Sequence, residues 1–271
     1  MTGSITFHPA DADGIARVVL ANDGKLNAID IAMWLALRGT FEALQAGPAA
    51  QAPRVVIVSG AGGQFASGGD IHEFAIFRFD EAQLHDFHEH IVAPALQAMQ
   101  ACDIPLIAQI DGACIGGGFE IAACCDIRIC GAASRFGAPI AKLGFPMAPG
   151  ELELLVHLAG AAALREMLLE GRLFDAPRAL QLGLVHAVVA DAQVEACTQQ
   201  RALAMAGLSP QAARINKRSL RQIAAGGATP PERRAHFGYA ASAEHREGVT
   251  AFIEKRRPRF SPDRADDPAT S

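Results

Sequence analysis

The sequence predicts an α/β fold in its first half and an almost entirely helical second half. Short apolar runs, such as residues 54–59 and 106–110, are rich in valine and isoleucine and are bounded by turn residues. Such runs are typical of strands buried inside a sheet. Segments with helical spacing separate them, as crossover connections in an α/β domain do. From about residue 150 onward the spacing is helical, with one short exception.

Strands are expected where short apolar or alternating runs stand between turn residues. The first two, residues 5–8 and 16–20, flank the turn sequence Asp-Ala-Asp-Gly, and aspartate and glycine favour tight turns. The other expected strands are residues 54–59, 106–110, 127–130 and 184–189.

Helices are expected where apolar residues recur at intervals of three and four. The predicted segments are residues 29–44, 81–102, 150–158, 161–170, 176–182, 191–206, 209–225 and 231–256, the last of them broken. Another helix is expected to begin near Gly117. The tail, residues 261–271, holds two prolines and small polar residues and is expected to be disordered. We therefore expect a core at 1–200 and a helical region at 201–260.

The composition argues against several classes of protein. A net charge of −5 disfavours a broad nucleic-acid surface. No run reaches the roughly 18 uninterrupted apolar residues of a membrane span, so no membrane partner is expected. The first residues have neither the basic region nor the apolar stretch of a signal peptide, so a cytoplasmic protein is expected.

The cysteines and the histidine cluster suggest neither disulfides nor a metal site. The six cysteines include no CxxC pair, and Cys124 and Cys125 are direct neighbours, so we expect buried free thiols. His85, His88 and His90 lack the i,i+4 spacing of a zinc-binding helix. Exposed histidines on a polar helix face are expected, and a histidine in a binding pocket is the alternative.

Two glycine-rich loops, residues 60–69 and 112–118, are the strongest functional signal. Each directly follows an expected buried strand. Glycine admits positive φ and lets a ligand approach the backbone, so two such loops at one sheet edge can aim two N–H groups at one point. Neither loop matches the GxGxxG, P-loop or GxSxG motif. Plain tight turns are the alternative for either loop alone.

Five segments resemble motifs of the crotonase (enoyl-CoA hydratase/isomerase) superfamily. Residues 65–74, FASGGDIHEF, resemble the family's FxAGxD signature, and residues 111–120, DGACIGGGFE, resemble NGxxxGGGxE. The other three are KLNA at 25–28, LLEGRLFDAPRALQLGLVHAV at 168–188 and EHREGVTAFIEKRRPRF at 244–260. All five stand in the family's order, which makes the resemblance highly specific.

This resemblance implies a crotonase-like ββα spiral with a helical C-terminal trimerisation region. By motif position, the backbone N–H groups of Gly69 and Gly117 would form an oxyanion hole for an acyl-CoA thioester. Glu120 matches the first of two glutamates that activate water in the family's hydratases. Ile140 stands at the position of the second glutamate and cannot transfer a proton.

Two other carboxylates, Glu151 and Glu153, follow Ile140 in the sequence, near the start of an expected helix. Glu151 is a candidate catalytic group that could reach back into the acyl pocket, and the alternative is a favourable charge at the helix N-terminus. Glu153 is expected on an exposed helix face.

The resemblance also implies contacts with the substrate. The residues at the corresponding positions are Lys25, Leu26, Ala66, Gly68, Asp70, Ile71, His72, Gly116, Phe252 and Lys255. In the family, the helix after the first glycine loop lines part of the acyl pocket, here residues 71–92. The last helix often reaches the CoA of a neighbouring subunit, so a homotrimer or dimer of trimers is expected. Coenzyme A is part of the substrate, and no other cofactor is expected.

The favoured function is hydration or double-bond isomerisation of an enoyl-CoA, with Glu120 as the acid/base group. One carboxylate is also compatible with decarboxylation or hydrolysis of another acyl-CoA. Because Ile140 replaces the second glutamate, a catalytically weak acyl-CoA-binding protein is a further alternative.

Overall fold

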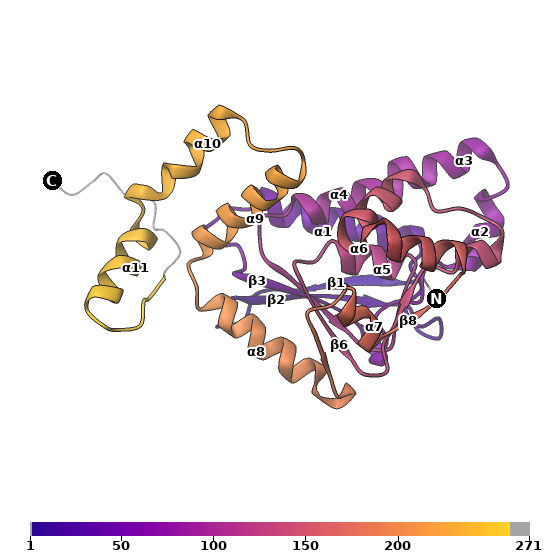
Figure 1. The fold of residues 1–271 in the computed structure, drawn as a ribbon, viewed down its shortest axis with the longest axis horizontal. Helices are drawn as coiled ribbons and strands as arrows, with labels where there is room; N and C mark the ends of the chain where they lie inside the picture. Colours follow the sequence, from indigo (N-terminus) through magenta and orange to yellow (C-terminus); the bar gives the residue numbers. More distant parts are fainter. Residues whose placement is uncertain (1, 261–271) are drawn as a thin grey trace.

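The computed structural model describes residues 2–260, so the tail expected to be disordered lies outside the described residues. The main sheet lies among the helices of the core in Figure 1. It has six strands in the order β1-β2-β3-β4-β6-β9. These are β1 (Ser4–His8), β2 (Ile15–Ala21), β3 (Val55–Gly60), β4 (Leu106–Ile110), β6 (Ile127–Gly131) and β9 (Ala187–Val189). Only the β1–β2 pair is antiparallel, so the carboxyl ends of the other strands meet at one edge of the sheet.

A second, three-stranded sheet lies in the order β5-β7-β8. It comprises β5 (Ala113–Ile115), β7 (Arg135–Gly137) and β8 (Phe174–Asp175). These short strands were not expected from the sequence, because three or fewer residues are too few to establish an alternating pattern. The α/β spiral with a helical C-terminal region agrees with the expected fold class.

Helices cover both faces of the main sheet. They are α1 (Ile31–Ala46), α2 (Ile71–Phe77), α3 (Glu81–Asp86), α4 (Ala93–Ala101), α5 (Gly117–Ala123), α6 (Pro149–Leu169), α7 (Ala176–Gln181), α8 (Val194–Ala206), α9 (Pro210–Ala224), α10 (Pro230–His236) and α11 (Ala243–Ile253). Val56 and Val58 of β3 face the large core on the side of α1, while Ile57 faces α8. Both faces are buried, which explains the continuous apolar runs of the parallel strands.

Two expected helices differ in detail from the observed ones. The segment expected as one helix at 81–102 contains α3, a π-helical stretch at Phe87–Val92, and α4. Pro94 has no N–H to donate to the carbonyl four residues earlier, so the regular α-helical pattern is interrupted there. The two helices expected at 150–158 and 161–170 form α6, whose regular geometry is broken at Gly160, with φ 72°.

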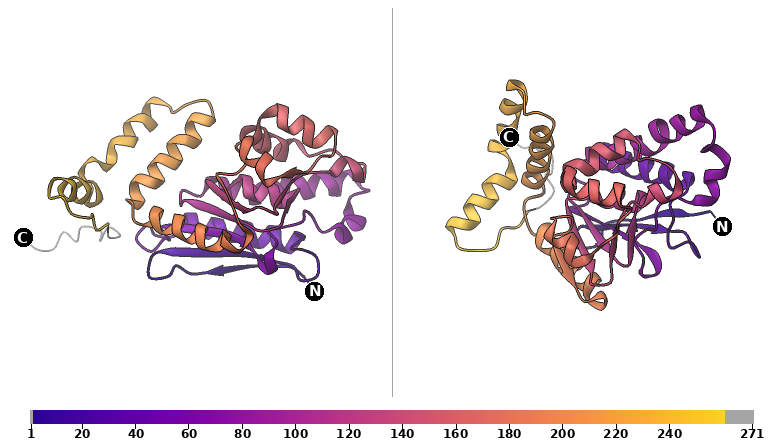
Figure 2. Two further views of the ribbon diagram at one scale, coloured as in Figure 1. Left: turned by 60° about the horizontal axis from the view of Figure 1, so that its bottom comes forward. Right: turned by 45° about the vertical axis from the view of Figure 1, so that its right-hand side comes forward.

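The helical region expected at 201–260 contains the end of α8 and then α9 to α11. Helix α8 continues past residue 200 to Ala206, and its Ala202 and Ala206 pack against Ile57 and Ile107 of the sheet. The extension proper is α9 to α11, which stand away from the sheet in both views of Figure 2. The expected break in the last helical segment lies between α10 and α11.

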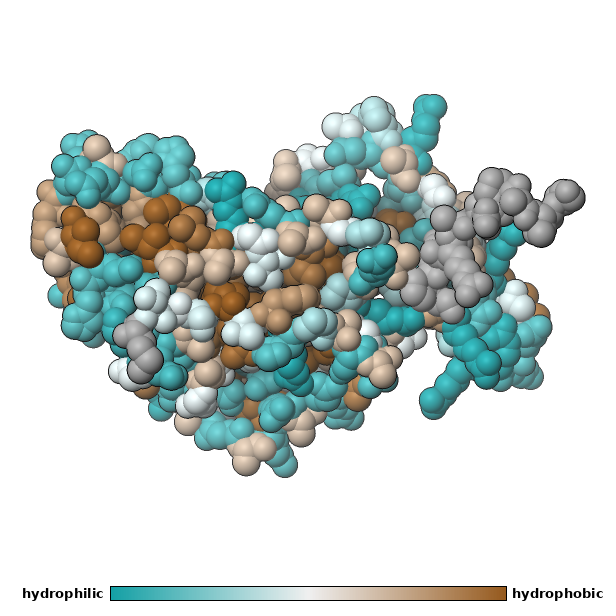
Figure 3. All heavy atoms as spheres, turned by 180° about the vertical axis from the view of Figure 1, so that it is seen from behind, coloured by the Kyte–Doolittle hydropathy of each residue, from teal (hydrophilic) through white to brown (hydrophobic). Residues whose placement is uncertain are grey.

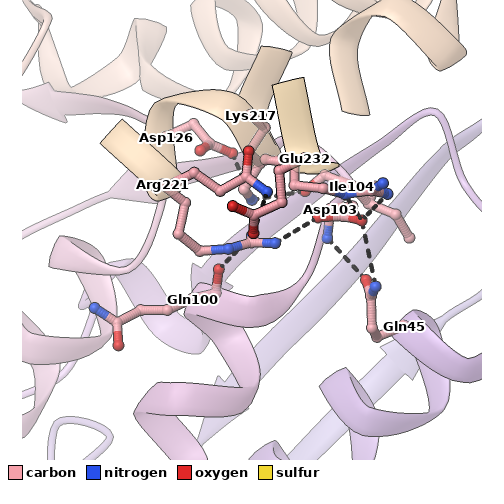
Figure 4. Close-up of polar contacts among 10 residues, drawn as sticks. Gln45, Gln100, Asp103, Ile104, Asp126, Lys217, Arg221 and Glu232 are labelled. Carbon is pink, nitrogen blue, oxygen red and sulfur yellow. Dashed lines mark hydrogen bonds and ion pairs between the residues drawn. The ribbon is translucent and has the colours of Figure 1, made fainter. Parts of the chain in front are cut away.

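Helix α9 is attached to the core through its basic face (Figure 4). Arg218 and Arg221 donate to the Asp103 carboxylate at 2.6 and 2.7 Å. Lys217 pairs with Asp126 at 2.8 Å. Hydrogen bonds from both arginines outweigh the effect of burial and hold the pKa of Asp103 below its usual value, although burial alone would raise it.

Patches of apolar residues lie among hydrophilic ones on the surface of the core at the end opposite the extension (Figure 3). Ile71, Ile76 and Phe79, in and just after α2, are exposed there. Among the described residues, no helix combines the length and the apolar character needed to cross a membrane.

Candidate active site

Three loops meet where the parallel strands β2, β3 and β4 end. The side-chain amide of Asn27 donates to the carbonyls of Ala61 and Gln64 at 2.8 and 2.7 Å. Ser67 N–H donates to the carbonyl of Leu26 at 3.0 Å. Leu26 and Asn27 both have positive φ, 49° and 56°, a conformation that these cross-loop hydrogen bonds maintain. The KLNA segment therefore supports the first glycine loop.

The first glycine loop is held so that the N–H of Gly69 is free. Ile29 N–H donates to the carbonyl of Gly68 at 2.7 Å, and Asp70 N–H donates to the carbonyl of Ile29 at 2.9 Å. Gly69 lies between the two bonded groups of this parallel pairing, so its own N–H points away from Ile29. Gly69 lines a cavity there, and its N–H has no acceptor within residues 2–260.

The second glycine loop presents another free N–H group. Gly117 is the first residue of α5, where an N–H has no acceptor inside the helix. The preceding Gly116 adopts φ 49° and donates to the carbonyl of Gly137 at 2.8 Å. A Cβ on Gly117 would lie 2.9 Å from Cζ2 of Trp34, so the space beside this backbone is filled.

Gly69 and Gly117 line the same cavity, which has a volume of about 340 Å³. Most of its lining is apolar and comes from α2, the π-helical segment and the loops before α6. The ionisable side chains in the lining are Arg78, His88, Glu120, Lys142 and Glu151. An apolar cavity with a few convergent polar groups is the usual form of a small-molecule site.

Glu120 is buried in this cavity, on the first turn of α5. Its Oε2 lies 3.9 Å from the position that a Cβ on Gly117 would take, so the carboxyl stands close to the backbone of Gly117. Burial, reinforced by the nearby Glu151 and opposed by Arg78, raises the pKa of Glu120 to about 8. At neutral pH this side chain is therefore mainly a neutral carboxylic acid, able to donate a proton.

Glu151 also reaches the cavity, from the first turn of α6. Its Oε1 lies 2.8 Å from Nδ1 of His88, on the π-helical segment. His88 is thus the pocket histidine that was the alternative reading, whereas His85 and His90 are exposed as expected. Glu153 is exposed, as expected for its helix face.

Ile140 lines the cavity, at the position where the motif would place a second glutamate. It contributes apolar surface only. The second buried carboxyl of this site therefore comes from α6 and not from the segment after β7.

Arg78, just after α2, was not singled out from the sequence. Its guanidinium carbon lies 4.0 Å from the ring centroid of Phe74 and 3.8 Å from that of Phe145. The i,i+4 spacing of Phe74 and Arg78 is a local signal that could have drawn attention to it. Phe145, on a distant segment, could not have been linked to it without the fold.

Some of the residues expected to contact the substrate line this cavity, and others do not. Gly68, Gly116 and Ile71 line it. The carboxylate of Asp70 caps α2 by accepting from His72 N–H, and it pairs with Lys25 at 2.5 Å. Lys25 and Asp70 are therefore held near the loop but lie outside the lining.

The remaining expected contacts lie elsewhere. Ala66 is fully buried, and its backbone N–H and carbonyl bond to the second loop. Leu26 and His72 are exposed outside the lining. Phe252 and Lys255 are exposed at the end of α11, on the extension, and do not line the cavity of their own chain.

The thiols take no part in the site. Cys102, Cys114, Cys124, Cys125 and Cys130 are free and buried. Burial raises the pKa of Cys125 to about 12, so its thiol stays protonated. Within residues 2–260 no group of three or more His, Cys, Asp or Glu side chains is arranged to hold a metal ion.

Comparison with known proteins places this geometry in a family. The family model described as enoyl-CoA hydratase/isomerase matches residues 10–263. The 2,3-dehydroadipyl-CoA hydratase of Escherichia coli is 33% identical over 209 residues, covering 76% of this chain and 80% of that protein. The mouse mitochondrial enoyl-CoA hydratase domain-containing protein 3 is 29% identical over 263 residues, covering 92% and 82% of the two chains.

A solved structure shows the same architecture. The enoyl-CoA hydratase/carnithine racemase from Magnetospirillum magneticum superposes with a TM-score of 0.89 at 34% identity, covering 96% of this chain and 97% of that one. With the family model spanning nearly the whole sequence, this agreement confirms the crotonase fold class. The chain belongs to the enoyl-CoA hydratase/isomerase family, within the crotonase superfamily.

Proposed function

We propose that the protein adds water across the α,β double bond of an enoyl-CoA thioester. The observation that carries this proposal is that two buried carboxyl groups, Glu120 and Glu151, line the cavity onto which Gly69 and Gly117 open. Hydration needs one group that takes a proton from water and one that gives a proton to Cα. Family membership supports an acyl-CoA substrate.

In this proposal the thioester oxygen accepts hydrogen bonds from the N–H groups of Gly69 and Gly117. Attack of water at Cβ moves negative charge onto that oxygen, and the two fixed N–H dipoles stabilise the resulting enolate. Neither N–H has another acceptor in the described chain, so neither must break a bond to act. The N-terminal end of α5 adds a favourable field at Gly117.

The two carboxyl groups have different roles because their surroundings differ. Glu151, hydrogen bonded to His88, takes the proton of the attacking water as its oxygen bonds to Cβ. Glu120, whose pKa is raised to about 8, donates its proton to Cα. The product has gained one OH and one H, and a proton returns from Glu151 to Glu120 through solvent after the product leaves. His88 is a positioning residue for Glu151.

A test compares hydration of crotonyl-CoA by wild type, Glu120→Gln and Glu151→Gln, followed by loss of the enoyl-thioester absorbance. We expect each variant to lose roughly 10²–10⁴-fold in kcat, the usual contribution of a general acid or base. Glu153→Gln, on the exposed face of the same helix, is the matched control and should retain wild-type activity. Full activity in both cavity variants would refute the assignment.

Double-bond isomerisation is the second candidate, and the presence of Ile140 favours it. Of the two positions where the family's hydratases have a glutamate, this chain keeps only Glu120. Isomerisation needs a single carboxyl group, which removes a proton and returns it. An isomerase would convert a 3-enoyl-CoA into the 2-enoyl isomer. Its activity would disappear in Glu120→Gln and survive in Glu151→Gln, whereas hydration requires both residues.

We further propose that α9 to α11 form the oligomerisation region of a homotrimer or dimer of trimers. Leu220 and Ile223 of α9 and Phe252 and Ile253 of α11 are exposed apolar side chains on this extension. An extension that leaves such side chains uncovered in one chain is suited to packing against another. Phe252 and Lys255 would then approach the CoA of a neighbouring copy.

A further inference from the structure

The Arg78 side chain, a cation in the cavity lining, has no hydrogen-bonding partner among the described residues. Arg78 ends α2 by donating its backbone N–H to the carbonyl of Phe74 at 2.9 Å, and its side chain lines the cavity. Within residues 2–260 the guanidinium makes no hydrogen bond or ion pair, and its Nε is buried without an acceptor. Buried donors are nearly always satisfied in folded proteins, so this one calls for a partner from outside the chain.

The head group is nevertheless held in a defined position. It stacks on Phe74 from α2 and on Phe145 from the loop before α6, whose rings meet edge to face with centroids 6.0 Å apart. Cation–π contacts orient the guanidinium plane but satisfy none of its N–H groups. The planar fork is therefore placed in advance for a bidentate acceptor, and a carboxylate has the matching geometry.

Within residues 2–260, no carboxylate occupies this fork. Glu120 and Glu151 act on Arg78 through space, yet neither forms an ion pair with it, and Glu151 is hydrogen bonded to His88. Burial disfavours the charged guanidinium, which lowers the pKa of Arg78. An anion that enters with the substrate would remove this cost of burying an unpaired charge.

Arg78 lies within reach of the acyl group of a bound thioester. A Cβ on Gly69 would lie 2.8 Å from Cζ of Phe74, and the same ring carries the Arg78 guanidinium. One phenyl ring thus separates the proposed thioester position from the guanidinium. Lys142, the other lysine or arginine of the lining, is exposed to solvent.

We propose that Arg78 binds a carboxylate at the far end of the acyl chain, so that the preferred substrate is the CoA thioester of an unsaturated dicarboxylic acid. This inference rests on the proposed function, since it names the substrate class of the same site. The apolar lining holds the chain, the glycine N–H groups hold its thioester end, and Arg78 holds its charged end.

The kinetic test uses pairs of 2-enoyl-CoA thioesters with equal chain length, four to six carbons, ending in either a methyl group or a carboxylate. The readout is the ratio of kcat/KM for the carboxylate-ended over the methyl-ended thioester. We expect wild type to favour the carboxylate, and Arg78→Met to lower the ratio by roughly 10²-fold, as expected for loss of one partner of a buried charge pair. Arg78→Lys, which keeps the charge and loses the fork, should fall between them.

Arg38→Met, which removes an exposed arginine from α1, is the control and should leave the ratio at its wild-type value. A wild-type preference for the methyl-ended thioester would overturn the proposal. So would an equal loss on both thioesters in Arg78→Met, which would mean that Arg78 acts on the Glu120 and Glu151 carboxyls.

A binding experiment separates this inference from the proposed reaction. Saturated acyl-CoA pairs with the same two chain ends, and free CoA, are titrated calorimetrically into wild type and Arg78→Met. Tighter binding of the carboxylate-ended thioester that is lost in Arg78→Met supports the subsite even if no enoyl-CoA is hydrated. An equal loss for free CoA would assign Arg78 to a CoA phosphate and overturn the proposal.

Discussion

At the scale of single residues, the site combines two carboxyl groups with contrasting surroundings. Glu120 is buried in the cavity, and burial is the largest cause of its raised pKa. Glu151 is hydrogen bonded to His88, which gives it a polar contact that Glu120 lacks. Acid and base roles in one pocket commonly arise from such a difference between neighbouring groups.

The raised pKa of Glu120 predicts how stability depends on pH. Because its pKa is about 8 in the folded protein, against 4.5 for an ordinary glutamate, the folded state binds more protons between these values. The unfolding free energy contributed by this group therefore falls as pH rises from about 4.5 to about 8. Glu120→Gln, which cannot ionise, should gain several kcal/mol relative to wild type over that range, since one pKa unit is worth ~1.4 kcal/mol.

Urea denaturation of both proteins at pH 5, 7 and 9 measures this difference. A constant gap between wild type and Glu120→Gln across the three values would show that Glu120 ionises normally.

The same residue predicts the pH dependence of catalysis. If Glu120 donates the proton to Cα, its protonated form is required, and kcat for hydration should decline as pH rises through about 8. A profile of kcat from pH 6 to 9.5 measures this. A rate that increased across the same interval would make Glu120 the base.

At the scale of elements, the geometry of the site depends on how short segments cross. Gly117 begins α5 directly against Trp34 of α1, and Gly118 lies against Ala66 of the first loop. A Cβ on Gly118 would stand 2.6 Å from the carbonyl oxygen of Ala66. Glycine at these positions lets the two loops approach closely enough for their N–H groups to share one cavity.

Gly117→Ala should impair catalysis because it disturbs the contact between the start of α5 and α1. The new methyl group would meet the Trp34 indole at 2.9 Å, so the start of α5 must shift and carry its N–H with it. We expect a loss of about 10²-fold in kcat, comparable to the loss of one oxyanion-hole donor.

The matched control is Gly39→Ala, since Gly39 lies in α1 with open space around it. That variant should keep full activity and gain roughly 0.5–1 kcal/mol of stability. Wild-type kcat in Gly117→Ala would exclude Gly117 as a donor to the thioester oxygen.

The attachment of α9 makes a second prediction at this scale. Asp103→Asn removes the carboxylate that accepts from Arg218 and Arg221, and loss of hydrogen bonds to a charged, buried group should weaken this docking by about 1–3 kcal/mol. Because the pKa of Asp103 is lowered in the fold, this contribution is present at pH 7 and is lost as pH falls through that lowered value.

Amide hydrogen exchange should show faster exchange in α9 and little change in β3 and β4. Glu42→Gln, which breaks an exposed pair with Arg38, is the control and should cost well under about 1 kcal/mol. Unchanged protection of α9 in Asp103→Asn would mean that other contacts hold the helix.

At the scale of the whole molecule, the candidate active site and the proposed oligomerisation region lie at opposite ends. The cavity is lined by the core, while α10 and α11 extend away from the core beyond α9 (Figures 1 and 2). Phe252 is 85% exposed on α11, a large apolar surface to leave uncovered. This separation suits the proposed contact between the extension of one copy and the CoA of another.

Replacement of Phe252 and Ile253 by serine should therefore weaken self-association. Light scattering across a dilution series is expected to show the variant moving toward the monomer mass at protein concentrations where wild type remains assembled. Leu35→Ser, on the exposed side of α1, tests whether loss of an exposed apolar side chain elsewhere on the molecule has the same effect. A wild-type mass that is monomeric at all concentrations would contradict the proposed oligomer.

Several features could be predicted from the sequence because they depend on local pattern. Apolar runs located the main strands, and the glycine motifs placed Gly69 and Gly117 after β3 and β4. Glu120 was singled out because it matches the family's motif, three residues after Gly117 on the first turn of the expected helix. Family resemblance along most of the chain supplied the fold class.

Only the tertiary structure decided what else enters the cavity. His88 and Glu151 are 63 residues apart in the chain, and the hydrogen bond between them requires α6 to pack beside the π-helical segment. Arg78 likewise meets Phe145 through folding, and its lack of a hydrogen-bonding partner within residues 2–260 is visible only in the folded structure. Sequence patterns record spacing along the chain, whereas burial, pKa and unpaired charge depend on distances between segments remote in sequence.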